Sequence, residues 1–160
     1  MDRITDTHVY FWGDPTFSNW GEARIVYKDK IFGNTEQAFM WEKAKFFGDE
    51  KIAEEILKND NPSVAKKLGR KVKNFDNESW IINSFTFMIS VNIAKFTQHE
   101  KMRKILLSTG DKTIVEASPY DKIWGVGLHW NDDEILDEHK WQGMNLLGKA
   151  LMEVRTKLKN

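Results

Sequence analysis

The sequence contains no cysteine, and this absence excludes disulfide bonds, thiolate metal ligands and thiol catalysis. It also lacks any run of the ~20 apolar residues that a membrane-spanning helix needs. The N-terminal residues have no apolar stretch of the kind found in signal peptides. These absences predict a cytoplasmic protein that has no membrane partner.

The formal net charge is zero, because Lys and Arg together number 24 and Asp and Glu together number 24. Such a balance argues against binding nucleic acid by neutralising phosphates over a broad surface. The histidines do not have the spacing of metal ligands, and the sequence has neither a Walker loop nor a Gly-x-Ser-x-Gly motif. We therefore expect no metal site and no cofactor.

Aromatic residues, by contrast, are abundant, with seven tryptophans and ten phenylalanines in 160 residues. Most are expected in the core, and some against a planar ligand. The length suits one core, and no repeat, linker or low-complexity segment divides the chain. We expect a single domain over residues 1–160.

The pattern of segments predicts an α+β fold that is mainly α-helical, with a small N-terminal β element. Helices are expected at residues 34–47, 49–58, 61–69, 78–96, 99–107 and 142–159, and short strands at 9–12, 24–27, 31–32 and 113–117. Asn34 and Asn61 are predicted N-caps. The segment 78–96 is apolar nearly all round its wheel, so we interpret it as a central buried helix.

The helix predicted at 34–47 carries two opposite charges on its apolar side. Seven residues separate Glu36 from Lys43, which at about 100° per residue places both on nearly the same side. Phenylalanines share that side, whereas Glu42 and Lys45 point the other way. Burying a charge among apolar side chains costs several kcal/mol unless something compensates it, so the arrangement calls for a reason.

Two interpretations fit this helix. In the functional one, burial lowers the pKa of Lys43 and makes its amine a nucleophile toward a carbonyl or a sugar anomeric carbon. Glu36, about 10 Å away along the helix axis, then holds the same ligand. In the structural one, the charges pair with groups elsewhere in the fold, or the lysine head reaches solvent. The helical wheel leaves both interpretations open.

Three further segments are candidate ligand contacts. The turn at Trp124 and Gly125 lets backbone approach a ligand closely, with Asp121 as a candidate acid/base, although an ordinary turn fits the spacing better. The basic segment 66–71 is able to hold a phosphate, but the helix dipole also favours basic residues at a helix end. The segment 17–20 offers an amide and an aromatic plane for a nucleobase.

Five motifs in order resemble the NADAR family, over about residues 8 to 157. They are Phe17-Ser18-Asn19-Trp20, the Thr35-Glu36 to Lys43-Ala44 segment, Gly69-Arg70, the Asp121 to Leu128 segment, and the segment from Trp141 through Asn145 to Arg155. The family includes YbiA-like N-glycosidases of riboflavin intermediates. The resemblance implies a compact YbiA-like α+β domain that hydrolyses an N-glycosidic bond.

The resemblance also implies a role for individual residues. The lysine that matches Lys43 attacks the ribose anomeric carbon and forms a Schiff base, which water resolves. Glu36 and Asp121 match acidic positions of the site and join Lys43 as predicted catalytic residues. Positions implied to contact substrate are Asn19, Trp20, Arg70, Trp124, Gly125 and Asn145.

Two departures from the family pattern bear on the substrate. Gln37 stands where many members have histidine, and the acidic stretch 130–139 replaces a short Gly/Lys-rich segment. We therefore expect ADP-ribose on guanine, as a nucleotide or within nucleic acid, or a related ADP-ribose adduct. The alternatives are phosphorylated ribosylamino-pyrimidine intermediates of riboflavin synthesis, a non-catalytic module that binds ADP-ribose or a nucleotide, and a protein-interaction adaptor.

Overall fold

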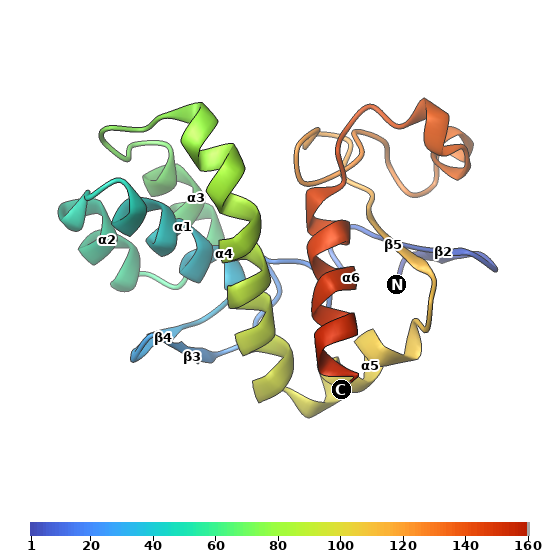
Figure 1. Ribbon diagram of the computed structural model, residues 1–160, viewed down its shortest axis with the longest axis horizontal. Helices are drawn as coiled ribbons and strands as arrows, with labels where there is room; N and C mark the ends of the chain where they lie inside the picture. The colour runs from blue at the N-terminus through green and yellow to red at the C-terminus, as the bar shows by residue number, and fades with distance from the viewer. Residues whose placement is uncertain (160) are drawn as a thin grey trace. The chain divides into compact units, whose positions relative to one another are not determined.

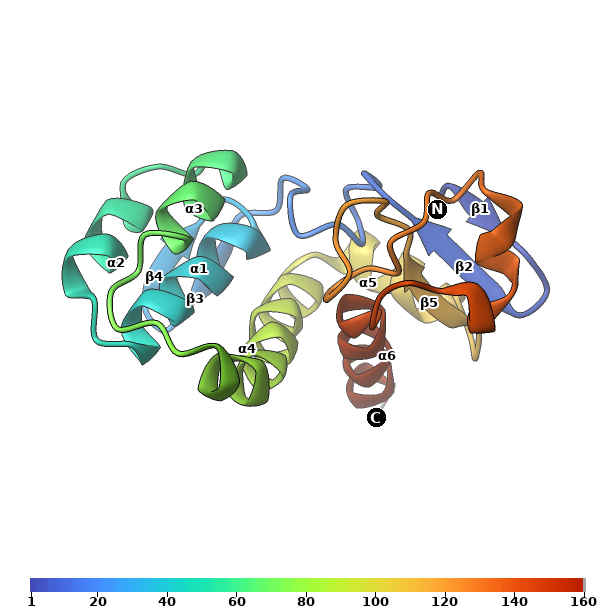
Figure 2. The ribbon, with the colours of Figure 1, turned by 90° about the horizontal axis from the view of Figure 1, so that it is seen from above.

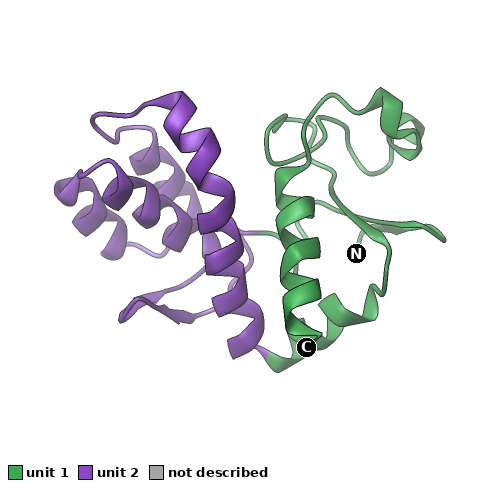
Figure 3. Cartoon of the chain, in the orientation of Figure 1, with its two compact units in different colours: residues 1–18, 100–160 green, residues 19–99 purple. Residues whose placement is uncertain are grey.

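The computed structural model describes residues 1–159 (Figures 1 and 2). Its internal contacts group the chain into two compact units (Figure 3). Unit 1 combines Met1–Ser18 with the segment from Glu100 to the C-terminus, and unit 2 is Asn19–His99. The single domain over residues 1–160 stays a prediction beside this division. No helix within residues 1–159 has the length and apolar character needed to cross a membrane.

Unit 2 consists of two short strands, paired as a β-hairpin, and of the helices that follow them. The sequence predicts both the strands and the helices. The hairpin pairs two short strands in antiparallel register, and its turn residues Lys28 and Asp29 have φ of 49° and 63°, as two-residue hairpin loops require. The elements are β3 (Ile25–Tyr27), β4 (Lys30–Phe32), α1 (Thr35–Phe46), α2 (Glu50–Leu57), α3 (Pro62–Gly69) and α4 (Asn77–Gln98).

Side-chain caps set where these helices begin. The Asn34 side chain accepts a hydrogen bond from the Gln37 amide at 2.8 Å, and Asn61 accepts one from the Ser63 amide at 2.9 Å. Pro62 occupies the first turn of α3, where its missing N–H costs nothing. Both predicted N-caps are therefore confirmed.

Helix α1 is buried on more sides than the wheel predicts. It packs against α2, α3, α4 and β4, and nine of its 12 residues are buried. Glu42, predicted to point away from the apolar side, is only 3% exposed and forms an ion pair with Lys28 at 2.9 Å. Because α1 has neighbours on several sides, its sequence has no clean polar face.

Helix α4 buries less of its surface than the sequence predicts. One side, which includes Trp80, Met88 and Phe96, is buried, whereas Ile81 and Ile82 are 41% and 75% exposed. The buried side also holds polar groups, among them Asn92, so the helix is a central packing element of unit 2 without being enclosed on all sides.

Unit 1 is built on a three-stranded sheet in the order β1-β2-β5. The strand β2 (His8–Phe11) pairs antiparallel with β1 (Arg3–Ile4) and parallel with β5 (Thr113–Glu116). The helix α6 (Leu146–Leu158) packs on β5, as Figures 1 and 2 show. The remaining elements are α5 (Glu100–Ser108), η1 (Asp133–Leu136) and η2 (Glu138–Lys140).

The helix α6 begins four residues later than residue 142, where the sequence predicts it. The backbone amides of Gln142 and Met144 donate to the carbonyls of Val126 and Lys122, so the chain there is held against a loop. Asn145 has φ of 54°, a left-handed conformation that no helix continues through. Tertiary contacts therefore override the helical pattern at this end.

Arg155, a buried charged residue of α6, has a structural role. Its Nη1 donates to the Thr109 hydroxyl at 2.9 Å and to the Lys112 carbonyl at 2.7 Å. Burial lowers the pKa of Arg155, and Asp111 opposes that effect. The guanidinium thus ties α6 to the loop that precedes β5.

Candidate active site

Lys43 is half-buried on α1, and its amine lies against an aromatic ring. The Nζ atom is 4.5 Å from the centroid of the Phe75 ring, which belongs to the segment between α3 and α4. Phe75 itself contacts Phe47 at a centroid distance of 5.4 Å. The Lys43 ammonium is therefore neither fully buried in the core nor fully exposed to solvent.

The pKa of Lys43 lies below its ordinary value. Burial is the largest cause, because it disfavours the charged ammonium. Two charges modify this effect: Glu36 on α1 raises the pKa, and Arg70 at the end of α3 lowers it. More of the lysine is consequently present as a neutral amine than for a lysine in water, as a nucleophile requires.

Glu36 and Asn19 are joined through the first turn of α1. The Glu36 amide donates to the Asn19 carbonyl at 3.0 Å, and the Thr35 hydroxyl donates to the Asn19 side-chain oxygen at 2.9 Å. Asn19 is 7% exposed and its side-chain nitrogen faces the sulfur of Met88 at 3.3 Å. Asn19 thus orients the start of α1; its predicted contact with substrate stays a prediction.

Arg70 is brought toward Lys43 by the close packing of α3 on α1. Gly69 is buried, and a Cβ at this position would collide with the side chain of Met40. Only a residue without a side chain lets the end of α3 approach α1 this closely. The exposed guanidinium that follows is then near enough to act on the lysine.

Trp20 is a predicted contact residue of unit 2 that is open to solvent. It is 47% exposed, and the Lys66 ammonium lies 6.0 Å from its ring centroid. Trp20 also lines an open groove of about 1030 Å³ between the hairpin and the α2–α3 loop. The pairing offers a flat apolar face and a positive charge side by side.

Gln37, one of the two departures from the family pattern, is committed to the fold. Its side chain accepts from the Gly33 amide at 2.8 Å and donates to the Ile56 carbonyl at 2.9 Å. The residue is 1% exposed. Its two hydrogen bonds join the hairpin, α1 and α2, so this departure has a structural use within unit 2.

The other predicted site residues belong to unit 1. Asp121 accepts hydrogen bonds from the amides of Ile123 and Trp124 at 2.9 and 2.8 Å, which closes a turn. A Cβ on Gly125 would lie 2.8 Å from the Asp121 carbonyl and 3.0 Å from that of Glu116, so the turn has no room for a side chain. Their roles toward substrate remain predictions.

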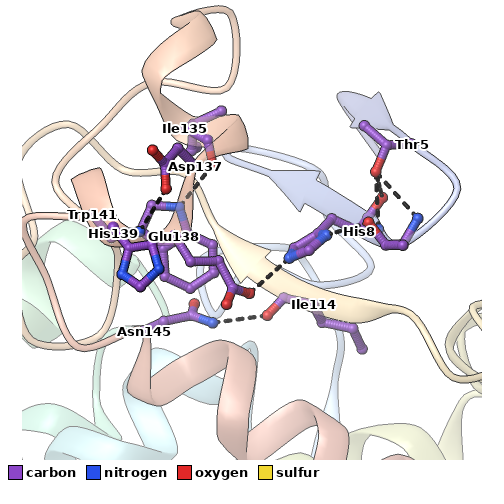
Figure 4. Close-up of polar contacts among 10 residues, drawn as sticks. Thr5, His8, Ile114, Ile135, Asp137, Glu138, His139, Trp141 and Asn145 are labelled. Carbon is purple, nitrogen blue, oxygen red and sulfur yellow. Dashed lines mark hydrogen bonds and ion pairs between the residues drawn. The ribbon is translucent and has the colours of Figure 1, made fainter.

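Asn145 is almost fully buried in unit 1. Its side chain donates to the Ile114 carbonyl and accepts from the Glu116 amide, both at 2.9 Å, and Figure 4 shows the first of these bonds. The amide side chain therefore completes the edge of β5. A contact between Asn145 and substrate stays a prediction beside this structural role.

The acidic segment 130–139 is anchored to the sheet of unit 1. Glu138 contacts the His8 ring nitrogen at 2.8 Å, as Figure 4 shows, and Asp133 forms an ion pair with Arg3 at 3.0 Å. The Trp141 indole donates to the Ile135 carbonyl at 2.8 Å. The segment is thus held against the first two strands through Arg3 and His8.

Phe75 is the site residue that sequence reasoning missed. It lies outside the predicted helices and follows Asn74, which has φ of 61°. A residue in an irregular segment belongs to no hydrophobic periodicity, so the sequence has no signal for it.

Among residues 1–159, no group of three or more His, Asp or Glu side chains is placed to hold a metal ion.

Comparisons with known proteins identify the family. The NADAR domain matches residues 10–159. The N-glycosidase R617 of Acanthamoeba polyphaga mimivirus is 39% identical over 165 residues, covering 94% of this chain and 96% of the relative. The N-glycosidase YbiA of Escherichia coli is 33% identical over 161 residues, covering 97% and 91%.

A solved structure agrees with these relatives. The NMR structure of the E. coli protein YbiA superimposes with a TM-score of 0.79 at 31% identity, covering 98% of this chain and 88% of that one. The mainly helical α+β fold is therefore that of YbiA. The matched domain and these relatives together show that the chain belongs to the NADAR family.

Proposed function

We propose that the protein is an N-glycosidase that releases an N-linked ribosyl group through a Schiff base on Lys43. It is a hydrolase acting on N-glycosyl bonds, in line with the N-glycosidase names of its relatives. The observation that carries the lysine assignment is a half-buried amine against the Phe75 ring, whose pKa is lowered by burial and is influenced by the charges of Glu36 and Arg70.

The chemistry follows from a neutral amine at that position. The amine bonds to the anomeric carbon as the bond from that carbon to the base breaks, and the base leaves with the electron pair and takes up a proton. The bond from the anomeric carbon to the ring oxygen then breaks, the ring oxygen takes up the proton that the amine loses, and the open-chain sugar remains on Lys43 as a protonated Schiff base. Water adds to it and releases the sugar, which regenerates the amine.

Glu36 is proposed to hold the substrate. Its carboxylate acts on the charge of Lys43, and its backbone is fixed by Asn19. A carboxylate accepts hydrogen bonds from sugar hydroxyls and from base N–H groups. Asp121 is proposed as the second acidic residue of the reaction, on the strength of the family motif alone.

The substrate that we propose is ADP-ribose attached to guanine, or a related ADP-ribose adduct. An aromatic ring stacks on a base, and Trp20 supplies such a ring. Cationic side chains bind phosphates, and Lys66, which lies beside Trp20, and Arg70 supply them. The acidic segment 130–139 separates the chain from the Gly/Lys-rich pattern of the riboflavin type. Riboflavin intermediates are the competing substrate in the test.

The test compares hydrolysis of ADP-ribosyl-guanine and of a ribosylamino-pyrimidine phosphate by three proteins: wild type, Lys43→Ala and Lys45→Ala. Lys45 is a matched control, because it lies on the same helix but is exposed and paired with Glu50. We expect release of guanine by wild type and Lys45→Ala and none by Lys43→Ala. Unchanged hydrolysis by Lys43→Ala would contradict the mechanism, and turnover of the pyrimidine alone would contradict the substrate.

A further inference from the structure

Phe75 is an exposed aromatic residue that touches the reactive amine. Its side chain is 45% exposed, whereas Trp80, in the same aromatic cluster, is 8% exposed. The Phe75 ring contacts Phe47, the residue that follows α1, and the Nζ of Lys43, which lies 4.5 Å from the ring centroid. Because almost half of Phe75 is open to solvent, part of its ring surface is accessible to a ligand that approaches Lys43.

The face of a phenylalanine ring binds two kinds of partner. It attracts a cation through the negative charge of the ring face, as it does with the Lys43 ammonium. It also stacks on a planar base, which every nucleobase allows. An ammonium and a base compete for the same area of one ring face.

The geometry of the reaction brings the base to this ring. An amine poised for attack lies about 3–3.5 Å from the carbon that it attacks. The leaving base is attached to that same carbon through a single bond of about 1.45 Å. The base therefore passes within a few ångströms of Lys43 Nζ, whose distance to the Phe75 ring centroid is 4.5 Å.

We propose that Phe75 is a specificity-determining residue of the Lys43 site: its ring face holds the ammonium of the unbound protein and stacks on the base of the bound substrate. The inference rests on the proposed function. It adds that the protein recognises the planar base of the substrate through Phe75. The sugar is not recognised by this ring.

This exchange couples base binding to the state of the lysine. A ring face stabilises the ammonium, so Lys43 in contact with Phe75 holds its proton more firmly. When the base occupies the ring, that stabilisation ends, while burial and Arg70 continue to favour the neutral amine and Glu36 continues to oppose them. Binding of the correct leaving group thereby releases the nucleophile.

The test uses Phe75→Leu, which keeps apolar bulk and removes the ring face. Phe46→Leu is the matched control, because Phe46 is 38% exposed and belongs to the same aromatic cluster through Phe47 and Trp80. We expect Phe75→Leu to raise KM for the ribosyl-base substrate about 10-fold, with a smaller change in kcat. Phe46→Leu should match wild type, and Phe75→Trp should restore binding.

A second measurement separates the base from the sugar. Ribose 5-phosphate carries no base, so borohydride should trap it on Lys43 of Phe75→Leu at least as fast as on wild type. The acid limb of kcat/KM against pH should move about half a pH unit lower in Phe75→Leu, because the ammonium loses its ring contact.

The outcomes distinguish this inference from the function on which it rests. An unchanged KM in Phe75→Leu, or a rise equal to that of Phe46→Leu, overturns the role of Phe75 while the Lys43 adduct, and with it the proposed function, stands. Slower trapping of ribose 5-phosphate by Phe75→Leu overturns recognition of the base alone. Absence of any wild-type adduct on Lys43 contradicts the proposed function itself.

Discussion

The side-chain oxygen of Asn19 accepts a hydrogen bond from the Thr35 hydroxyl at 2.9 Å, inside unit 2. The Asn19 carbonyl accepts a second bond, from the amide of Glu36. The Asn19 side chain of the motif at 17–20 is thus used to hold the fold, while its neighbour Trp20 is 47% exposed. Two adjacent motif residues therefore have different tasks, one of them structural.

Asn19→Ala and Trp20→Ala should separate these tasks. Removing Asn19 leaves the buried Thr35 hydroxyl without this partner, so the free energy of unfolding should fall by about 1–3 kcal/mol. Trp20→Ala removes an exposed ring, so we expect a change in that free energy within about 0.5 kcal/mol, together with weaker binding of ADP-ribose. Urea unfolding and ligand titration measure both, and equal stability losses in the two variants would refute the division.

The pH dependence of the reaction should follow the charges around Lys43. The neutral amine is the attacking form, so the rate of adduct formation should rise with pH up to the pKa of Lys43, which lies below the usual ~10.4. Glu36→Gln removes the charge that raises this pKa and should move the profile to lower pH. Arg70→Gln removes the charge that lowers it and should move the profile to higher pH. Shifts in the same direction for both variants would contradict the assignment.

Asp49 should support the segment that carries Phe75. Its carboxylate accepts from the Lys73 amide at 2.9 Å and from the Ile52 amide at 3.1 Å, and these bonds lower its pKa. Because the folded pKa lies below the unfolded value of about 3.9, this stabilisation is present above that pH and is lost as the pH falls through the folded pKa.

Asp49→Ala should therefore lower the urea midpoint at pH 7 and make it less sensitive to acid. Asp6→Ala is a suitable control, because Asp6 is an exposed carboxylate in unit 1. An Asp49→Ala midpoint that falls with acid as steeply as the wild type would count against this role of the carboxylate.

Asn145→Ala should destabilise the protein whether or not the residue touches substrate. The substitution removes bonds to the Ile114 carbonyl and the Glu116 amide, and it places alanine at a φ of 54°. Together these losses should cost about 2–4 kcal/mol in the free energy of unfolding. Asn145→Gly keeps the backbone conformation and should recover part of that loss. Wild-type stability in Asn145→Ala would show that the side chain is not the support of β5.

The sequence predicts the local features of unit 2 well, because their causes are local. The asparagine caps of α1 and α3 each depend on a few neighbouring residues. The placement of Lys43 with Glu36 on one side of α1 follows from helical geometry alone. The Glu36 carboxylate raises the pKa of Lys43, which agrees with that placement.

Features that depend on contacts between residues far apart in the chain could not be predicted from the sequence. The parallel pairing of His8–Phe11 with Thr113–Glu116 joins segments about a hundred residues apart, and neither strand encodes its partner. The burial of Glu42 depends on Lys28 in the hairpin. Phe75 becomes a site residue only because the α3–α4 segment folds back onto α1.

The most direct test of the central claim is borohydride trapping of the wild-type protein with ribose 5-phosphate and with ADP-ribose, followed by mass mapping of peptides. The account predicts one reduced adduct, on Lys43, that is absent in Lys43→Ala and retained in Lys45→Ala. An adduct on Lys45 or another exposed lysine, or no adduct at all alongside normal hydrolysis, would contradict it.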